Sequence, residues 1–156
     1  MMTNEELLER YPFLRPRNRW TGELMNQDEK EDEELWTELD DMPMGWRIAF
    51  GEQMCEELLE ILKEGNYVEE YMIVQIKEKY AELRWYDNGV PEKVWDKYRD
   101  WLYKYEELSR RTCIRCGKPA TLISRGWISP YCDCIKESEF YNEAGYMPIK
   151  DFYKED

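Results

Sequence analysis

Four of the five cysteines lie within one short stretch of the chain. They form two pairs, Cys113-x2-Cys116 and Cys132-x-Cys134, with fifteen residues between the pairs. Thiolate pairs that tight turns deliver, with a short hairpin between them, are typical of zinc ribbons, in which four sulfurs surround one ion. Because sulfur fills every position, such a site has no place left for an activated water. The spacing therefore predicts one structural zinc ion bound by Cys113, Cys116, Cys132 and Cys134.

Two other states of these cysteines have to be weighed, namely two disulfides or four free thiols. Disulfides require an oxidising compartment, and residues 1–6 are acidic and contain no apolar run typical of a signal peptide. Gly117 favours a metal, because it lets the backbone turn with a positive φ and direct N–H groups at sulfur. The Cys132-x-Cys134 pair has one intervening residue where zinc ribbons usually have two. Its turn must therefore be tighter, or another residue must replace one of the two cysteines as a ligand. Cys55 falls in a helical pattern and is expected to be a buried apolar residue.

The elements expected to position the cysteines come before them in the chain. Apolar residues recur at three- and four-residue steps over residues 46–62 and 94–108, which predicts two amphipathic helices. A period of two over residues 72–76 and 83–86 predicts a β-hairpin, and a smaller hairpin is expected over residues 120–131. The predicted fold is α+β, with two amphipathic helices, a β-hairpin and a C-terminal four-cysteine appendage similar to a zinc knuckle or ribbon.

The length of 156 residues suits one domain. Within it, the capping-box pattern of Thr3 and Glu6 predicts a short helix that ends near Arg10. The expected segments are a short helix and extended arm (1–25), an acidic loop (26–41), an α+β core (42–110), a zinc knuckle (111–136) and a C-terminal tail (137–156).

The acidic charge is concentrated in the first half of the chain. Residues 1–70 contain 20 acidic and seven basic residues, which accounts for the whole net charge of −13, whereas residues 71–156 contain 15 of each. A field of this sign repels nucleic-acid phosphates and attracts basic surfaces. Direct nucleic-acid binding is therefore disfavoured, and a basic protein is the expected partner. The alternative is that the acidic residues only keep the chain soluble.

Two acidic surfaces are candidates for partner binding. One is the polar face of the helix predicted over residues 46–62 and just beyond it, with Glu52, Glu56, Glu57, Glu60 and Glu64. The other is the acidic loop, with Asp28, Glu31, Asp32, Glu33 and Glu34. A helix face needs little ordering when it binds, whereas a loop loses backbone freedom.

Catalysis and membrane insertion are both disfavoured by the composition. The chain has no histidine, which excludes Ser-His, Cys-His and His-metal catalysis. Its carboxylates occur in exposed runs instead of isolated apolar settings that would separate their pKa values. No segment approaches the roughly 18 consecutive apolar residues of a membrane span. A cytosolic protein that is not an enzyme is expected, and an enzyme of unknown class is the third alternative.

Four segments together resemble a family of small bacterial and phage proteins without assigned activity. They are Gln75–Tyr80, Leu83–Gly89, Thr112–Pro119 and Gly126–Cys132. The resemblance covers residues 42–136 and brings no catalytic residues. The family usually spaces its last two cysteines as Cys-x2-Cys, so Cys134 departs from the pattern. The resemblance implies a phage or prophage setting in the cytosol of a bacterial host.

The leading hypothesis combines this setting with the charge. Short, strongly acidic, non-enzymatic phage proteins are often similar to inhibitors of host defence, including anti-CRISPR proteins that occupy basic surfaces of RNA-guided nucleases. By this analogy the chain is a non-catalytic inhibitor of a basic nucleic-acid-handling protein, such as a type II CRISPR nuclease. The second hypothesis is a zinc-knuckle regulator that binds nucleic acid through the basic residues around the cysteines, namely Arg110, Arg111, Arg115, Lys118 and Arg125. The acidic background favours the other interpretation, that those charges offset the negative charge of a zinc ion held by four thiolates.

Overall fold

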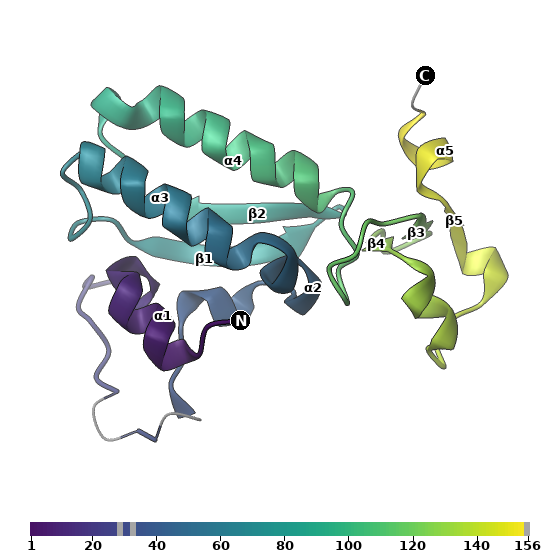
Figure 1. Ribbon diagram of the computed structural model, residues 1–156, viewed down its shortest axis with the longest axis horizontal. Helices are drawn as coiled ribbons and strands as arrows, with labels where there is room; N and C mark the ends of the chain where they lie inside the picture. The colour runs from purple at the N-terminus through teal and green to yellow at the C-terminus, as the bar shows by residue number, and fades with distance from the viewer. Residues whose placement is uncertain (28–29, 32–33, 155–156) are drawn as a thin grey trace.

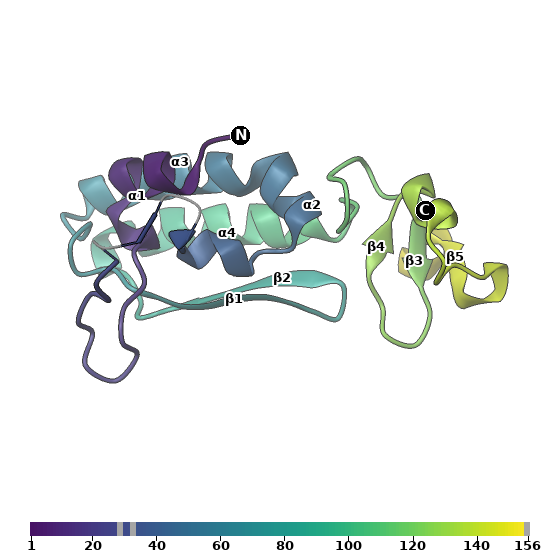
Figure 2. The same cartoon turned by 90° about the horizontal axis from the view of Figure 1, so that it is seen from below.

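A two-stranded hairpin covered on one face by two helices forms the core of the molecule (Figures 1 and 2). The computed structural model describes residues 1–27, 30–31 and 34–154. The elements of this core are α3 (Glu52–Glu64), β1 (Ile73–Lys79), β2 (Glu82–Asp87) and α4 (Trp95–Ser109). The inward-facing Ile76, Leu83 and Trp85 are buried under the helices. Trp85 meets Trp101 edge to face, with 5.4 Å between the ring centroids. The predicted mixture of helix and sheet and the predicted hairpin are confirmed.

The first amphipathic helix is less regular than predicted. A short helix α2 (Met44–Trp46) leads into a π-helical turn (Arg47–Gly51), and α3 follows directly. A π-helical turn contains more residues than an α-helical one, so it shifts the phase of the residues around it. As a result Trp46, Arg47 and Phe50 are all buried. The Arg47 guanidinium donates to Asp40 Oδ1 at 2.7 Å and to Asn4 Oδ1 at 2.9 Å, so this buried charge ties the N-terminal segments to the core.

The N-terminal helix α1 (Asn4–Arg10) begins at the predicted cap. The Thr3 hydroxyl accepts a hydrogen bond from the Glu6 N–H at 3.2 Å. A 3₁₀ turn (Pro12–Leu14) follows, and α1 lies beside α3 in Figure 1. The end of the predicted acidic loop also packs on the core, because a 3₁₀ turn (Glu38–Asp41) buries Glu38 and Leu39. This part of the loop is therefore not the solvent-exposed charge run that its composition suggests.

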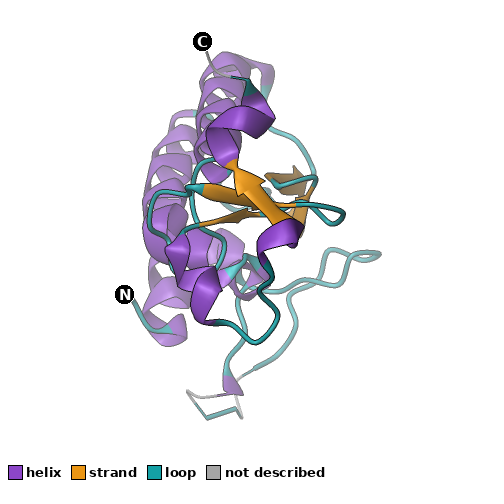
Figure 3. Cartoon of the chain, turned by 90° about the vertical axis from the view of Figure 1, so that its right-hand side faces the viewer, coloured by secondary structure: helices purple, strands orange, loops and turns teal. Residues whose placement is uncertain are grey.

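The residues after α4 form a separate small sheet beyond the ends of the helices. Figure 3 shows the molecule from the side on which this sheet lies. We call residues 111–154 the cysteine module. Its elements are β3 (Leu122–Ser124), β4 (Pro130–Tyr131), β5 (Tyr146–Pro148) and α5 (Ile149–Tyr153), and the strand order is β4-β3-β5. The β3–β4 hairpin was predicted. The third strand comes from the segment predicted as a tail, and it pairs with β3 in antiparallel register.

Three short helical turns connect the described elements of the second half of the chain, namely the 3₁₀ turns Glu92–Val94, Asp133–Glu137 and Glu143–Gly145. The first leads into α4, and the second carries the last two cysteines of the module. Within the described part of the chain, no helix is long and apolar enough to cross a membrane.

Candidate metal centre

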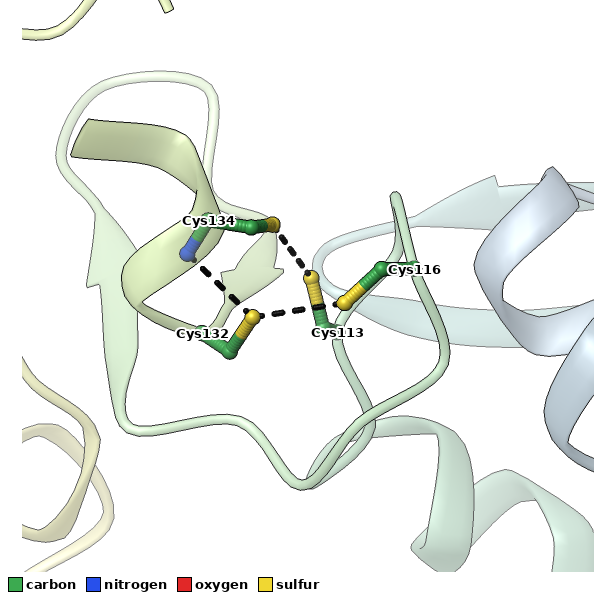
Figure 4. Close-up of side chains that lie close together, drawn as sticks. All are labelled: Cys113, Cys116, Cys132 and Cys134. Atoms are coloured by element: carbon green, nitrogen blue, oxygen red, sulfur yellow. Dashed lines mark hydrogen bonds between the residues drawn. The ribbon is translucent and has the colours of Figure 1, made fainter. Parts of the chain in front are cut away.

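The four clustered cysteines point their sulfurs at a common centre (Figure 4). All four Sγ atoms lie within 4.8 Å of one another. The Sγ atoms of Cys113 and Cys134 are 3.5 Å apart, and those of Cys116 and Cys132 are 3.3 Å apart. A disulfide would need about 2.05 Å, so the thiols are free. A tetrahedron with metal–sulfur bonds of about 2.3 Å has sulfur–sulfur edges of about 3.8 Å, and the cluster matches that size. Four cysteines that could hold one metal ion are therefore in place.

The first cysteine pair lies on a tight backbone turn. The Cys113 N–H donates to the Lys118 carbonyl at 2.7 Å, and the Gly117 N–H donates to the Cys113 carbonyl at 3.0 Å. Gly117 has φ +84°, in the left-handed region that disfavours residues with a Cβ. A Cβ there would also lie 2.7 Å from the Gly45 carbonyl oxygen. The predicted role of Gly117 as the turning residue is confirmed.

Helix α2 holds this turn against the core. The Gly45 N–H donates to the Ile114 carbonyl at 2.9 Å, and the Trp46 indole N–H donates to the Thr112 carbonyl at 3.0 Å. A Cβ added to Gly45 would lie 2.2 Å from the Cys113 carbonyl oxygen, so only glycine permits this approach. Sequence reasoning missed Gly45. Gly45 directly precedes the helix predicted over residues 46–62, so the pattern marks it as a helix boundary, whereas the structure places it inside α2.

The unusual Cys-x-Cys pair fits because it starts a 3₁₀ turn. Cys132 caps this turn, and its sulfur accepts a hydrogen bond from the Cys134 N–H at 3.4 Å. The tighter turn brings the Cys134 sulfur into the cluster, so all four cysteines named from the sequence meet. On the other side, the Ile114 N–H donates to the Pro130 carbonyl at 3.0 Å and joins the two halves of the cluster.

The electrostatics of the cluster favour a bound cation. Burial raises the pKa of the Cys113 thiol, but hydrogen bonds from backbone N–H groups, chiefly those of Cys116 and Cys132, outweigh it and bring the pKa to about 7. Burial and the neighbouring sulfurs raise the pKa of Cys134. The first thiolate therefore forms readily, and its negative charge disfavours deprotonation of the next thiol. A divalent ion removes this repulsion and deprotonates the remaining thiols.

The fifth cysteine takes no part in the cluster. Cys55 lies on α3 and is fully buried in the apolar core, as predicted. Its burial raises the pKa of the thiol far above the ordinary value. Thiolate is the form that binds metals and reacts, so Cys55 is an apolar packing residue.

Several basic residues around the cluster are engaged within the chain. The guanidinium of Arg110 lies 4.7 Å from the centre of the Tyr153 ring, and that of Arg111 lies 5.7 Å from it. Arg110 also donates to Glu107 at 2.9 Å, and Arg115 donates to the Cys134 carbonyl at 3.3 Å. Lys118 and Arg125 are exposed. Three of these five cations therefore help to assemble the cysteine module.

The glutamates of the predicted helix face lie on α3, and two of them face α1. Glu56 accepts hydrogen bonds from the Arg10 guanidinium at 2.5 Å and from the Tyr11 hydroxyl at 2.8 Å, and these bonds lower the pKa of Glu56. Glu52 accepts from the Met2 N–H at 3.2 Å. The two glutamates thus bind the N-terminal helix to the core.

Two further glutamates of this face turn toward α4. Glu57 accepts from Lys104 Nζ at 2.7 Å and from the Tyr105 hydroxyl at 2.5 Å. Glu64 accepts from Lys97 Nζ at 2.7 Å. Part of the charge of the helix face is therefore neutralised inside the chain.

The other predicted acidic residues differ in exposure. The Glu60 side chain is 67% exposed and has Lys63 at 3.6 Å, which is a loose ion pair. Glu31 and Glu34 are exposed. Asp28, Asp32 and Glu33 lie outside the described residues. Of the named acidic positions on α3, Glu60 is the one that projects most freely into solvent.

In comparisons with protein-family models, curated proteins and solved structures, no match to the chain was found.

Proposed function

We propose that the chain is a non-catalytic binding protein in which the four clustered cysteines hold one structural zinc ion. In this function the acidic N-terminal half occupies a basic surface on a nucleic-acid-handling protein, such as an RNA-guided nuclease of a type II CRISPR system. The observation that carries the metal part is the cluster of four sulfurs within 4.8 Å of one another. Zinc is the ion that such an all-sulfur tetrahedral site suits best.

The role of the zinc is structural in this proposal. Four sulfur ligands leave no position for water, and the turn that holds two of them is fastened to the core through Gly45 and Trp46. The cysteine module would then be a zinc knuckle of ribbon type, built on the β3–β4 hairpin and completed by β5. Its ion stabilises the module locally, because closed zinc sites contribute folding free energy.

The proposed partner-binding surface is the pair of helices α1 and α3. The Arg10–Glu56 ion pair and the Met2–Glu52 hydrogen bond hold the helices side by side. Glu6 and Glu9 on α1 are exposed, as is Glu60 on α3. This arrangement offers a rigid acidic surface, which binds at a lower entropic cost than a loop. A basic nucleic-acid-binding surface is the complementary one, and proteins that compete for it need no catalytic group.

The test uses a purified type II CRISPR nuclease, treated with nuclease to remove bound nucleic acid, as the probe. We expect the chain to bind this RNA-free nuclease, and to slow target cleavage after guide RNA has been added back. The variant Glu9→Lys/Glu60→Lys reverses two exposed charges without breaking the Arg10–Glu56 pair. It should raise the dissociation constant about tenfold or more, because each unfavourable charge contact costs on the order of 1 kcal/mol.

The matched control is Asp96→Lys/Asp100→Lys. These two carboxylates are exposed like Glu9 and Glu60, but they lie on α4 in the half of the chain that carries no net charge. The control should bind as the wild type does. Equal weakening by both double variants would show that only total charge matters. Absence of binding by the wild type would reject this partner.

A further inference from the structure

A hollow between the core hairpin and the cysteine module is not used by the proposed function. Residues 77–80 at the tip of the hairpin form one wall, and residues 126–128 of the β3–β4 loop form the other. Its volume is about 340 Å³. Figure 2 shows the two loops approaching each other beyond the ends of the helices. The hollow thus joins the two halves of the molecule, and no residue of the metal cluster lines it.

Two aromatic side chains stand exposed at this hollow, one on each wall. Tyr80 is 70% exposed and Trp127 is 80% exposed. Large aromatic surfaces are costly to leave in water, and they gain free energy when a planar ligand stacks on them. The hollow is therefore suited to flat rings.

The backbone at Tyr80 supports a role for its side chain. Tyr80 and Ala81 form the turn of the hairpin with φ of +54° and +67°. This turn geometry favours Asn-Gly, and a tyrosine in the left-handed region costs on the order of 1 kcal/mol. Ala81 is buried and fills space, but the Tyr80 ring points into solvent and contributes no core packing. Backbone strain of this kind is typical of binding sites.

A lysine ammonium group lies near each of two tyrosine rings of the hairpin, Tyr80 and Tyr86. Lys79 Nζ lies 5.5 Å from the centre of the Tyr80 ring, and Lys77 Nζ lies 5.7 Å from the centre of the Tyr86 ring. Tyr86 is 43% exposed on the outer face of the hairpin. The acidic residue of the wall, Glu78, turns away to other partners. Its carboxylate accepts hydrogen bonds from the Ala81 N–H at 2.9 Å and from the Ser129 hydroxyl at 3.5 Å.

We propose that this hollow, which we call the groove, binds single-stranded nucleic acid, with bases stacked on Tyr80 and Trp127 and with phosphates beside Lys77 and Lys79. Alternating aromatic rings and cations match the alternation of bases and phosphates along a single strand. An acidic peptide would satisfy the lysines but leave the two exposed rings without a planar partner. A duplex hides its base faces and cannot stack on them.

The net charge of the chain does not prevent this binding. In Figure 2, α1 lies at the far end of the hairpin from the groove. Fixed charges beyond about 8 Å are largely screened at physiological ionic strength. The acidic half therefore slows the approach of the strand, while the contacts in the groove are decided by the local lysines and rings. The two halves of the chain would then suit different components of one nucleoprotein, and the groove does not depend on the proposed function.

Binding is tested on the full zinc-loaded chain without any partner protein. The probes are fluorescently labelled single strands of RNA and DNA, about ten nucleotides long, titrated by anisotropy at roughly 50 mM and roughly 200 mM salt. Trp127→Ala should weaken binding about five- to 150-fold, which is the range measured for loss of one stacked base. Lys77→Gln/Lys79→Gln should weaken it and reduce the slope of log K against log salt by about 1.4, at about 0.7 per phosphate contact.

Matched controls separate the groove from general effects. Trp20→Ala removes a tryptophan that is 95% exposed on the N-terminal arm, and Lys63→Gln/Lys93→Gln removes two exposed lysines elsewhere. Both controls should bind as the wild type does. Unchanged near-ultraviolet circular dichroism and thermal midpoint of Trp127→Ala establish that it is folded, which its exposure predicts.

The affinities for the two probes show whether the groove prefers RNA or DNA, because the preferred nucleic acid is the one that binds more tightly. The proposal is overturned if neither single strand binds at the lower salt, or if Trp127→Ala and Trp20→Ala bind equally well. It is also overturned if an acidic peptide binds in the groove while both oligonucleotides do not. Loss of partner binding by the Glu9→Lys/Glu60→Lys variant has no bearing on this result.

Discussion

Replacing Gly45 by alanine should weaken the contact between α2 and the turn that carries Cys113 and Cys116. A Cβ at this position would lie 2.2 Å from the Cys113 carbonyl oxygen and 2.5 Å from the Ile114 carbonyl carbon. Ordinary contact begins at 3.4 Å, so the backbone of the turn must move by about 3.4 − 2.2 = 1.2 Å. Such a movement also breaks the hydrogen bond from the Gly45 N–H to the Ile114 carbonyl.

The expected loss of stability is about 1–3 kcal/mol. Overpacking costs about 1–3 kcal/mol, and a lost hydrogen bond costs about 1 kcal/mol. The better helix propensity of alanine returns up to about 1 kcal/mol. The direction is informative, because propensity alone predicts that Gly45→Ala stabilises the helix.

The assay is urea unfolding in the presence of excess zinc, followed by tryptophan fluorescence, and Gly51→Ala is the control. Gly51 belongs to the same helical run, and the nearest atom to an added Cβ there is the Arg47 Cγ at 3.3 Å, which needs to move by only about 0.1 Å. Gly51→Ala should leave the free energy of unfolding within about 1 kcal/mol of wild type. If Gly45→Ala is as stable as Gly51→Ala, the close docking of the turn on α2 is wrong.

Three further predictions concern other parts of the molecule. Chelation of the metal should raise hydrogen exchange in the cysteine module, for example at the Ile149 amide that donates to the Thr121 carbonyl, while α3 and α4 keep their protection; equal exchange throughout would contradict a locally acting ion. Tyr98→Phe removes a hydroxyl that donates to the Asp87 carboxylate and should lower the free energy of unfolding by about 1–3 kcal/mol, whereas the exposed control Tyr103→Phe should not. Burial is the largest cause, and a hydrogen bond with Glu82 the second, of a pKa of Glu106 that is raised from 4.5 to about 7. The protonated form is therefore favoured in the folded state, and its contribution to stability, complete below about pH 4.5, is lost as the pH rises through about 7. Glu106→Gln should gain stability over wild type at about pH 8 compared with about pH 5 in urea unfolding, and a constant difference across this range would refute the shift.

Local pattern was enough to predict the elements that depend on near neighbours. The cap at Thr3, the hairpin of β1 and β2 and the amphipathic character of α3 and α4 follow from spacings of two to four residues. The cysteine cluster was also accessible, since Cys113-x2-Cys116 is a strong local signal. Even the short Cys132-x-Cys134 pair was recognised, although its 3₁₀ turn was not.

Contacts between distant segments account for what the sequence did not predict. The strand β5 has only three residues, and it exists because β3 offers an unpaired edge. Arg47, in the π-helical turn, bonds to Asp40 and Asn4, which belong to earlier segments of the chain. The acidic face of α3 looked free on a helical projection, but Arg10 and Lys104 reach it from other helices.

If the four sulfurs are the complete ligand set of one zinc ion, X-ray absorption at the zinc edge will show it on protein purified without added metal. We expect one zinc per chain with four sulfur neighbours at about 2.3 Å and no nitrogen or oxygen neighbour. Cys116→Ser should lose the ion or exchange one sulfur for oxygen, whereas Cys55→Ala should give the wild-type spectrum. A wild-type spectrum with a water or carboxylate oxygen in place of a sulfur would contradict a closed structural site, and protein that contains no zinc would contradict the site itself.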